Sequence, residues 1–230
     1  MRETFDLLVK FPTRGRPDKF RNQFDRYYDM LSGQLKVKFI VSMDADDASM
    51  NNEEIKWWLS PASKGRQNIH FYYGNSKTKV QAINADMEHH NDWKILLVGS
   101  DDMTPQVYEY DKVIYDDMMR FYPSLDGALH YNDGRQGPAL NTLVVMGKVM
   151  YDNFGYIYHP QYTSVYADNE FHDVTNRMGK VQYIDTVIIK HDWVDYTGAD
   201  PLHLRNESFY PEDGDVYNRR KERGFPKGFV

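Results

Sequence analysis

The chain has 230 residues, no cysteine, and 34 acidic against 28 basic side chains, which gives a formal net charge of −6. The lack of cysteine excludes disulfides, thiolate metal sites and a cysteine nucleophile, so any divalent cation must bind oxygen and imidazole ligands. The apolar runs of the chain, such as 95–98 and 187–189, are far short of the roughly 20 residues of a membrane span. Because residues 1–6 also lack a secretory-signal pattern, we expect no membrane span and a cytoplasmic location.

Strand and helix patterns alternate through the first half of the chain. The apolar run at 5–11, which ends at Pro12, predicts a buried strand. Apolar side chains at helical spacing then predict a helix over 17–32, with Gly33 as its stop. The same criteria predict strands at 36–43, 68–73 and 93–98 and helices at 52–59 and 76–90. Repeated units of this size predict an α/β fold with a mostly parallel central sheet and helices on both faces.

The alternation weakens beyond about residue 120. Strands are predicted at 127–131, 142–146 and 181–189, a Gly-rich loop at 132–138, and a helix at 168–178. The last 35 residues hold Gly, Pro and charge with little periodicity, and we expect them to wrap the surface, with the basic run 219–223 as a solvated tail. We therefore predict one domain over residues 1–193 and a C-terminal extension, 194–230, that packs on it.

The loop after the first predicted strand, 12–17, carries two arginines and leads into a helix. Guanidinium groups beside a helix N-terminus suit an anion such as a diphosphate. An ordinary turn with exposed Arg14 and Arg16 is the alternative.

Acidic side chains follow the second and the fourth predicted strands, where the ligands of a parallel sheet usually bind. Asp44 and Asp46 can accept hydrogen bonds from a nucleobase or a ribose, although Asp-rich turns also cap helices. Asp101 and Asp102 leave the most apolar strand side by side. Two such carboxylates repel each other unless a cation compensates them, and oxygen ligands select Mg²⁺ or Mn²⁺. A solvated acidic turn is the alternative.

Two more side chains stand at the start of a helix and at the end of a strand. Asp168 begins the helix at 168–178, where it can act as a base or simply as an N-cap. His191 closes the strand region that begins at 181, where an imidazole can serve as a metal ligand or as a structural group.

In this order and spacing, these segments resemble the GT-A nucleotide-sugar glycosyltransferases, most closely those of family 2. The resemblance spans residues 5–193. It rests on 11–17 (FPTRGRP), 43–47 (MDADD), 75–84 (NSKTKVQAIN), 100–102 (SDD) in the DxD position, 167–171 (ADNEF) in the position of the Glu-Asp-x-Asp/Glu-Leu motif, and His191. The chain departs from the family pattern at Ser100, which replaces the first Asp of DxD, and at Ala167, which replaces the acidic residue before the base.

The resemblance implies a role for each matching residue. A metal bridging the diphosphate, Mn²⁺ or Mg²⁺, would bind Asp102 and His191, and Asp168 would be the catalytic base. Asp44 or Asp46 would contact the nucleobase, and Asp101 would contact the ribose or the sugar. The residues implied to bind the nucleotide and the donor sugar are Pro12, Thr13, Arg14, Arg16, Asp44, Asp46, Lys79 and Asp101.

The implied activity is a metal-dependent, inverting transfer of a sugar from a nucleoside diphosphate sugar, first of all a UDP-sugar, to a hydroxyl acceptor. The acceptor is a glycan or, as a second option suggested by the 18 Tyr and the basic tail, a hydroxymethylated base in DNA. A sugar-phosphate nucleotidyltransferase and a non-catalytic sugar-binding module are the alternatives.

Overall fold

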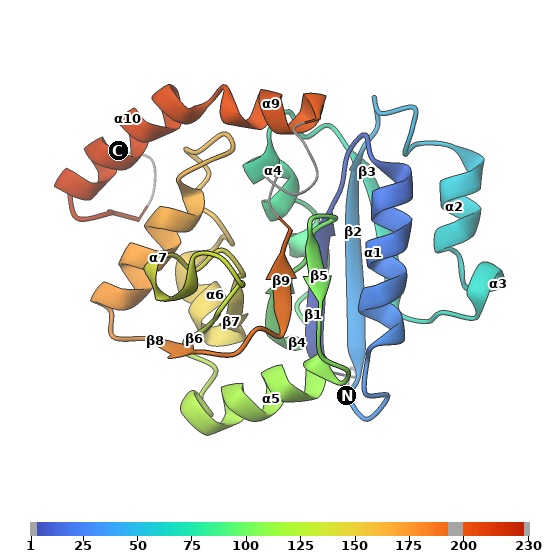
Figure 1. Ribbon diagram of the computed structural model, residues 1–230, viewed down its shortest axis with the longest axis horizontal. Coiled ribbons are helices and arrows are strands. Elements are labelled where there is room, and N and C mark those ends of the chain that lie inside the picture. Colours follow the sequence, from blue (N-terminus) through green and yellow to red (C-terminus); the bar gives the residue numbers. More distant parts are fainter. Residues whose placement is uncertain (1–3, 193–199, 228–230) are drawn as a thin grey trace.

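A computed structural model describes residues 4–192 and 200–227, and its centre is a seven-stranded sheet (Figure 1). All neighbouring strands are parallel except for the two pairs that β7 makes, with β4 and with β6. The predicted α/β class and the mostly parallel sheet are confirmed. From edge to edge the strands are β3 (Ile69–Gly74), β2 (Val37–Asp44), β1 (Phe5–Pro12), β4 (Trp93–Val98), β7 (Val145–Gly147), β6 (Ala128–Tyr131) and β8 (Val181–Ile184).

The strand order reverses at β1, which pairs with β2 on one side and with β4 on the other. The backbone continues this pairing beyond the strand ends, because Thr13 N donates to Ser42 O at 3.0 Å and Gly99 N donates to Lys10 O at 2.9 Å. In an open α/β sheet the crevice at such a switch point is where ligands bind. A ligand-binding site is therefore expected at the carboxyl ends of β1, β2 and β4.

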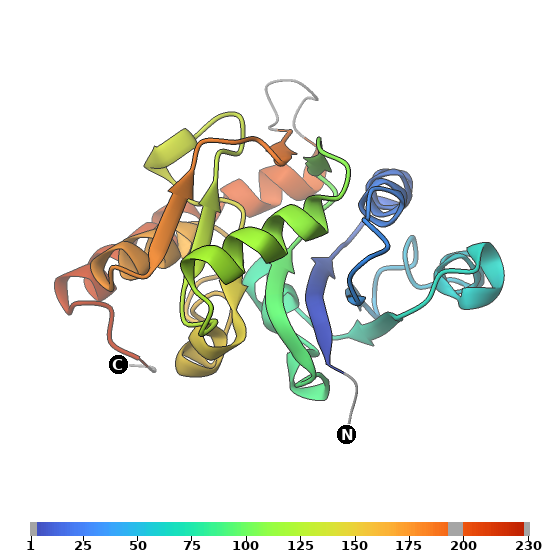
Figure 2. The same ribbon diagram turned by 90° about the horizontal axis from the view of Figure 1, so that it is seen from below.

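Helices cover both faces of the sheet, as predicted, because successive side chains of each strand point to opposite sides. Phe11 packs edge-on against Phe20, Phe24 and Tyr27, and Leu8 belongs to the core on the other face. Figure 2 shows α5 lying across one face. The first layer holds α1 (Pro17–Asp29), α2 (Glu53–Leu59) and α5 (Tyr110–Phe121), and the second holds α4 (Lys79–Asn84), α6 (Lys148–Phe154) and α7 (Ala167–Arg177).

Several predicted boundaries are wrong. The helix expected at 76–90 is only α4, because Ala85 is extended and Asp86 has a φ of 64° before the short 3₁₀ turn η1 (Met87–His89). The first helix ends at Asp29, before the predicted 32. The sequence analysis also missed α5 and α6 and the short pieces α3 (Pro61–Lys64) and η2 (Gly137–Ala139).

The single strand expected at 181–189 is also wrong. It consists of β8 in the main sheet and β9 (Ile189–His191) in a separate two-stranded sheet with β5 (Met103–Pro105). This antiparallel β5–β9 pair joins two segments that are far apart in the sequence.

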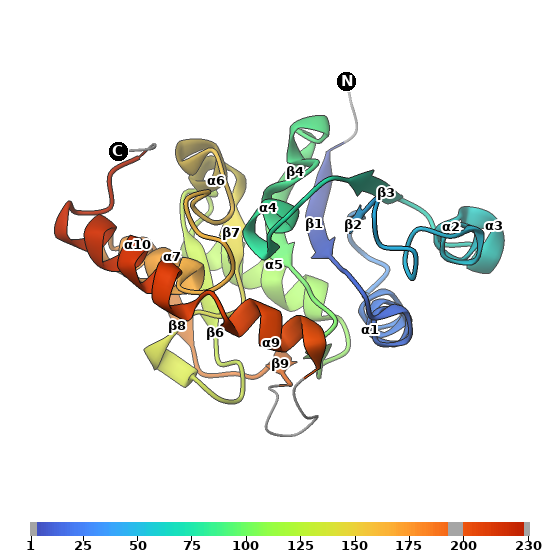
Figure 3. The ribbon, with the colours of Figure 1, turned by 90° about the horizontal axis from the view of Figure 1, so that it is seen from above.

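The C-terminal segment contains two helices, although we expected little regular structure there. They are α9 (Pro201–Glu207) and α10 (Tyr210–Glu222), which follow one another along the molecule with α10 against α7 (Figures 1 and 3). Arg220 is buried and donates to Glu170 at 2.7 and 2.8 Å, so the basic run is not wholly a solvated tail. The predicted boundary at 193/194 lies outside the described residues. No helix within residues 4–192 and 200–227 has the length and apolar character needed to cross a bilayer.

Candidate active site

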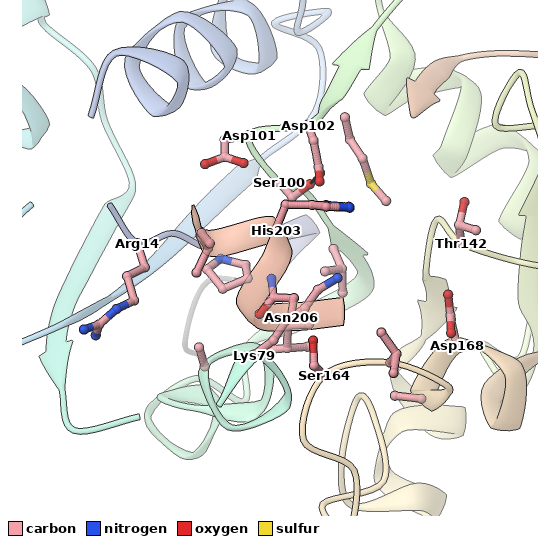
Figure 4. Close-up of a pocket in the computed structure, with 18 of the residues that line it drawn as sticks. Arg14, Lys79, Ser100, Asp101, Asp102, Thr142, Ser164, Asp168, His203 and Asn206 are labelled. Carbon is pink, nitrogen blue, oxygen red and sulfur yellow. Dashed lines mark hydrogen bonds between the residues drawn. The ribbon is translucent and has the colours of Figure 1, made fainter. Parts of the chain in front are cut away.

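One cavity of about 620 Å³ opens at the carboxyl ends of β1, β2 and β4. Figure 4 shows Asp101 and Asp102 on one wall of it and Asp168 on another. Asp46 does not line it: that side chain is exposed and pairs with Arg14. All the other predicted site residues line the cavity: Pro12, Thr13, Arg14, Arg16, Asp44, Lys79, Asp101, Asp102, Asp168 and His191.

The two arginines of the β1 loop are engaged with carboxylates. Arg14 Nη1 donates to Asp44 Oδ2 at 2.7 Å and to Asp46 Oδ1 at 2.6 Å. Arg16 donates to Asp101 Oδ1 at 2.9 Å and to Asp200 Oδ1, at the start of α9, at 2.7 Å. Neither guanidinium is left exposed as in an ordinary turn. Both hold acidic side chains in place around the cavity, and direct contact with a diphosphate stays a prediction.

The adjacent carboxylates after β4 have pKa values shifted in opposite directions. Burial, and then the charge of Asp102, raise the pKa of Asp101 to about 6, although Arg16 opposes the shift. Burial also acts on Asp102, but its interactions with His191, Lys79 and Ser100 outweigh that effect and lower its pKa below the ordinary value. Asp102 is therefore the member of the pair that stays ionised.

The β5–β9 pair brings His191 next to Asp102. Met103 lies opposite His191 in this pair, and Asp192 N donates to Asp102 O at 2.7 Å. His191 Nε2 then lies 3.9 Å from Asp102 Oδ2. The sequence places these residues 89 positions apart, and backbone pairing, not local sequence, joins them.

This pair of side chains fits a divalent cation. Two ligands that are each about 2.1 Å from one ion lie roughly 3 to 4.2 Å apart, depending on the angle between them, and the observed 3.9 Å falls in that range. Mn²⁺ accepts both carboxylate and imidazole ligands. Within residues 4–192 and 200–227, no group of three or more His, Cys, Asp or Glu is arranged to hold a metal. A cation here would need further ligands from a diphosphate, water or both.

Asp168 lies in the first turn of α7 and is not its N-cap. The cap is Tyr166, which has a φ of 59° and makes no side-chain capping bond. Burial raises the pKa of the Asp168 carboxyl, and Lys79 and His191 partly oppose this. The charge of Lys79 lowers the pKa of both Asp102 and Asp168. Lys79 has no hydrogen-bond or ion-pair partner among the described residues. One ammonium group is thus available in the cavity between two carboxylates.

The sequence analysis missed a whole wall of the cavity, which α9 supplies. His203 and Asn206 of α9 line it, with Ser164 and Thr142 from other loops (Figure 4). Tyr210, the first residue of α10, also lines the cavity. The start of α9 carried a usable signal, because Asp200 precedes Pro201 and its side chain accepts from His203 N at 2.9 Å. Asp followed by Pro at the first helical position is a common helix start.

No protein-family model and no curated protein sequence matches the chain, but solved structures do. The mannosyltransferase PcManGT from Pyrobaculum calidifontis, in complex with GDP-Man and Mn²⁺, superposes with a TM-score of 0.59 at 12% identity, over 82% of this chain and 57% of that one. S. aureus TarS 1–349 in complex with UDP superposes with a TM-score of 0.61 at 10% identity, over 94% of this chain and 71% of that one. TarS 1–349 in complex with UDP-GlcNAc superposes with a TM-score of 0.59 at 10% identity, over 85% of this chain and 61% of that one.

The chain has a GT-A-like fold. The match agrees with the resemblance of the sequence motifs to GT-A glycosyltransferases, and the cavity of this GT-A-like domain lies at its strand-order switch point. The chain spans 57% of the length of PcManGT, so its activity and substrates are taken up as proposals.

Proposed function

We propose that this chain is a divalent-cation-dependent glycosyltransferase that moves a sugar from a nucleoside diphosphate sugar to a hydroxyl group, with inversion at the sugar carbon. The observation that carries the proposal is that one cavity joins Asp44, the Asp102–His191 pair and Asp168. Structures of similar fold are complexes with GDP-Man and Mn²⁺, UDP, or UDP-GlcNAc. A UDP-sugar is the first donor to test, and we expect a cytoplasmic protein.

The acidic side chains at the ends of β2 and β4 would bind the donor. Asp44 is buried at the end of β2 and held by Arg14, so a carboxylate oxygen in a fixed position can accept from the base or the ribose. Asp101 is held in the same way by Arg16. We assign the nucleobase to Asp44 and the ribose or donor sugar to Asp101.

Asp102 and His191 would hold the cation, and Lys79 would lie beside the phosphates. When bound, a divalent cation offsets the negative charge that develops on the departing diphosphate. Lys79 adds a second positive charge from the α4 side of the cavity, where preorganised charge stabilises the transition state.

Asp168 would act as the base from the α7 side. The acceptor oxygen forms a bond to the sugar carbon while the bond from that carbon to the diphosphate oxygen breaks, and the acceptor proton passes to Asp168. The raised pKa of Asp168 brings it closer to the working pH, which favours a general base.

The alternatives have less support. A nucleotidyltransferase would carry a longer Gly-rich phosphate loop, whereas the β1 loop has only Gly15, whose N–H donates to Asp47 Oδ2 at 2.6 Å. The DNA acceptor rested partly on the basic run 219–223, in which Arg220 is buried against Glu170. We therefore propose a glycan hydroxyl as the acceptor.

A thermal-shift screen tests the proposal. UDP, GDP and their sugars, each with and without Mn²⁺, should raise the melting temperature only where the native state binds them. Asp102→Asn should remove the Mn²⁺-dependent part of the shift. Asp116→Asn is a matched control, because Asp116 is exposed on α5 and pairs with Lys112 one turn away. A wild-type protein that shows no shift with any nucleotide would overturn the proposal.

A further inference from the structure

Asp133 is a buried carboxylate in the loop after β6 and had no role in the sequence analysis. It is 1% exposed. Its Oδ1 accepts from the backbone N–H groups of Arg135 at 2.9 Å and Gln136 at 2.6 Å. Its Oδ2 accepts from Thr142 Oγ1 at 2.7 Å. These bonds fix the position of the carboxylate, and hydrogen bonding to the charged form helps to lower its pKa against the effect of burial.

The fixed carboxylate faces the imidazole of His191. His191 Nδ1 lies 3.9 Å from Asp133 Oδ2, while His191 Nε2 lies 3.9 Å from Asp102 Oδ2. The backbones are also joined, because His191 N donates to Asp133 O at 2.9 Å. Each of the two imidazole nitrogen atoms therefore lies 3.9 Å from a carboxylate oxygen.

We propose that Asp133 is a positioning residue that keeps the Nδ1 proton on His191, so that the Nε2 lone pair is directed at the cation beside Asp102. The inference rests on the proposed function, since it assumes a cation at Asp102 and His191. A neutral imidazole carries one proton, and the group that accepts it decides which nitrogen remains able to bind a metal. Asp133 faces Nδ1, whereas Asp102 faces Nε2 on the cavity side.

Asp133→Asn is the informative variant because it has the same shape. Its amide oxygen can still accept from the N–H groups of Arg135 and Gln136, so the loop is retained. Its NH₂ group then stands where Oδ2 faced Nδ1, and it favours the opposite tautomer, with the proton on Nε2. Loss of such a partner typically lowers metal affinity 10- to 100-fold.

The affinity for Mn²⁺ in the presence of UDP is measured by electron paramagnetic resonance of free Mn²⁺. We expect Asp133→Asn to weaken it 10- to 100-fold. Asp185→Asn is the matched control: it removes one negative charge from a nearby exposed carboxylate that bonds to Asn132 and Tyr183, not to His191. We expect its Mn²⁺ affinity to equal that of the wild type.

A second measurement does not depend on any variant folding. Nitrogen NMR of the wild-type imidazole at pH 8, without metal, should show the proton on Nδ1 of His191. A proton on Nε2, or equal Mn²⁺ affinity of Asp133→Asn and wild type, would overturn the role of Asp133. A wild type that binds no Mn²⁺ with UDP, yet has the Nδ1 proton, would instead overturn the proposed cation site.

Discussion

The two sides of the sheet are built differently. The strands β3, β2, β1 and β4 are parallel and have six to eight residues each, and their core is packed mainly with aromatic and aliphatic side chains. On the other side, β7, β6 and β8 have three or four residues and include the antiparallel strand. We call these the amino-terminal and carboxyl-terminal halves. In the proposed mechanism, the first half would carry most of the donor contacts, and the second half would supply the base, Asp168, from the first turn of α7.

Buried polar contacts hold the carboxyl-terminal half together. Glu170 of α7 pairs with Arg220 of α10, with side chains 5% and 2% exposed. Asp213 of α10 accepts from the backbone N–H groups of Thr163, Ser164 and Val165 at 2.8 to 2.9 Å. The loop before Asp168 is thus tied to the C-terminal helices.

The largest expected effect is on the reacting group. Asp168→Asn should lower the rate of UDP release from the bound donor by about 10²- to 10⁴-fold, the usual contribution of a general base. The donor-dependent thermal shift should stay at the wild-type value, because the proposed donor contacts, Asp44, Asp101 and the Asp102–His191 pair, do not include Asp168. Loss of donor binding together with the rate would contradict this division of roles.

The next effect is on stability. Arg220→Met should lower the free energy of unfolding by about 3 to 5 kcal/mol, because the carboxylate of Glu170 would stay buried without its cation. Urea unfolding measures this change. The double variant Arg220→Met with Glu170→Met is the control, and it should recover most of the loss. A double variant as unstable as the single one would show that the ion pair itself is needed.

Lys10 is a fully buried charged side chain in the amino-terminal half. Burial lowers its pKa from 10.5 to about 8, while its Nζ donates to Ala85 O at 2.8 Å. The unfolded state binds more protons than the folded state between these values, so stability should rise with pH across this range. Relative to Lys10→Met, the wild type should gain about 1 kcal/mol between pH 7 and pH 9. Parallel stability curves for the two proteins would show that the pKa of Lys10 is not lowered.

The smallest effect concerns a glycine inside α10. A Cβ at Gly214 would lie 3.4 Å from the ring of Tyr166, which is an ordinary contact. Gly214→Ala should therefore stabilise the protein by about 0.5 to 1 kcal/mol through helix propensity. Gly155→Ala is the opposite control, because its φ of 77° disfavours any side chain. Destabilisation by Gly214→Ala would mean that α10 packs more tightly on Tyr166 than this distance indicates.

The amino-terminal half could be predicted from the sequence because its signals are local. Strands β1, β2, β3 and β4 are apolar runs bounded by Pro, Gly or Asp, and each prediction is within about a residue of the observed strand. The parallel pairing of these strands agrees with the predicted, mostly parallel sheet. Most of the acidic side chains after them consequently lie in one cavity.

The carboxyl-terminal half could be predicted less well because its order depends on distant contacts. The sequence predicts one strand at 181–189, but pairing with β6 and with β5 divides the region between two sheets. Helix α10 has a weakly amphipathic sequence, and it is held through Asp213 and Arg220 by partners about 50 residues away. Asp133 carried no signal at all, because a loop aspartate acquires its partner only when His191 folds beside it.

The β5–β9 pair also sets a time order for assembly. Asp102 is synthesised long before His191, and the pair that joins them forms only after β9 has been made. Contacts between such distant segments are slow to form, since a long loop must close first. A chain emerging from the ribosome can complete its amino-terminal sheet early, but the proposed cation site would form only once residue 191 has docked. In the proposed enzyme, retention of the nucleotide together with Mn²⁺ would therefore report on the final stage of folding.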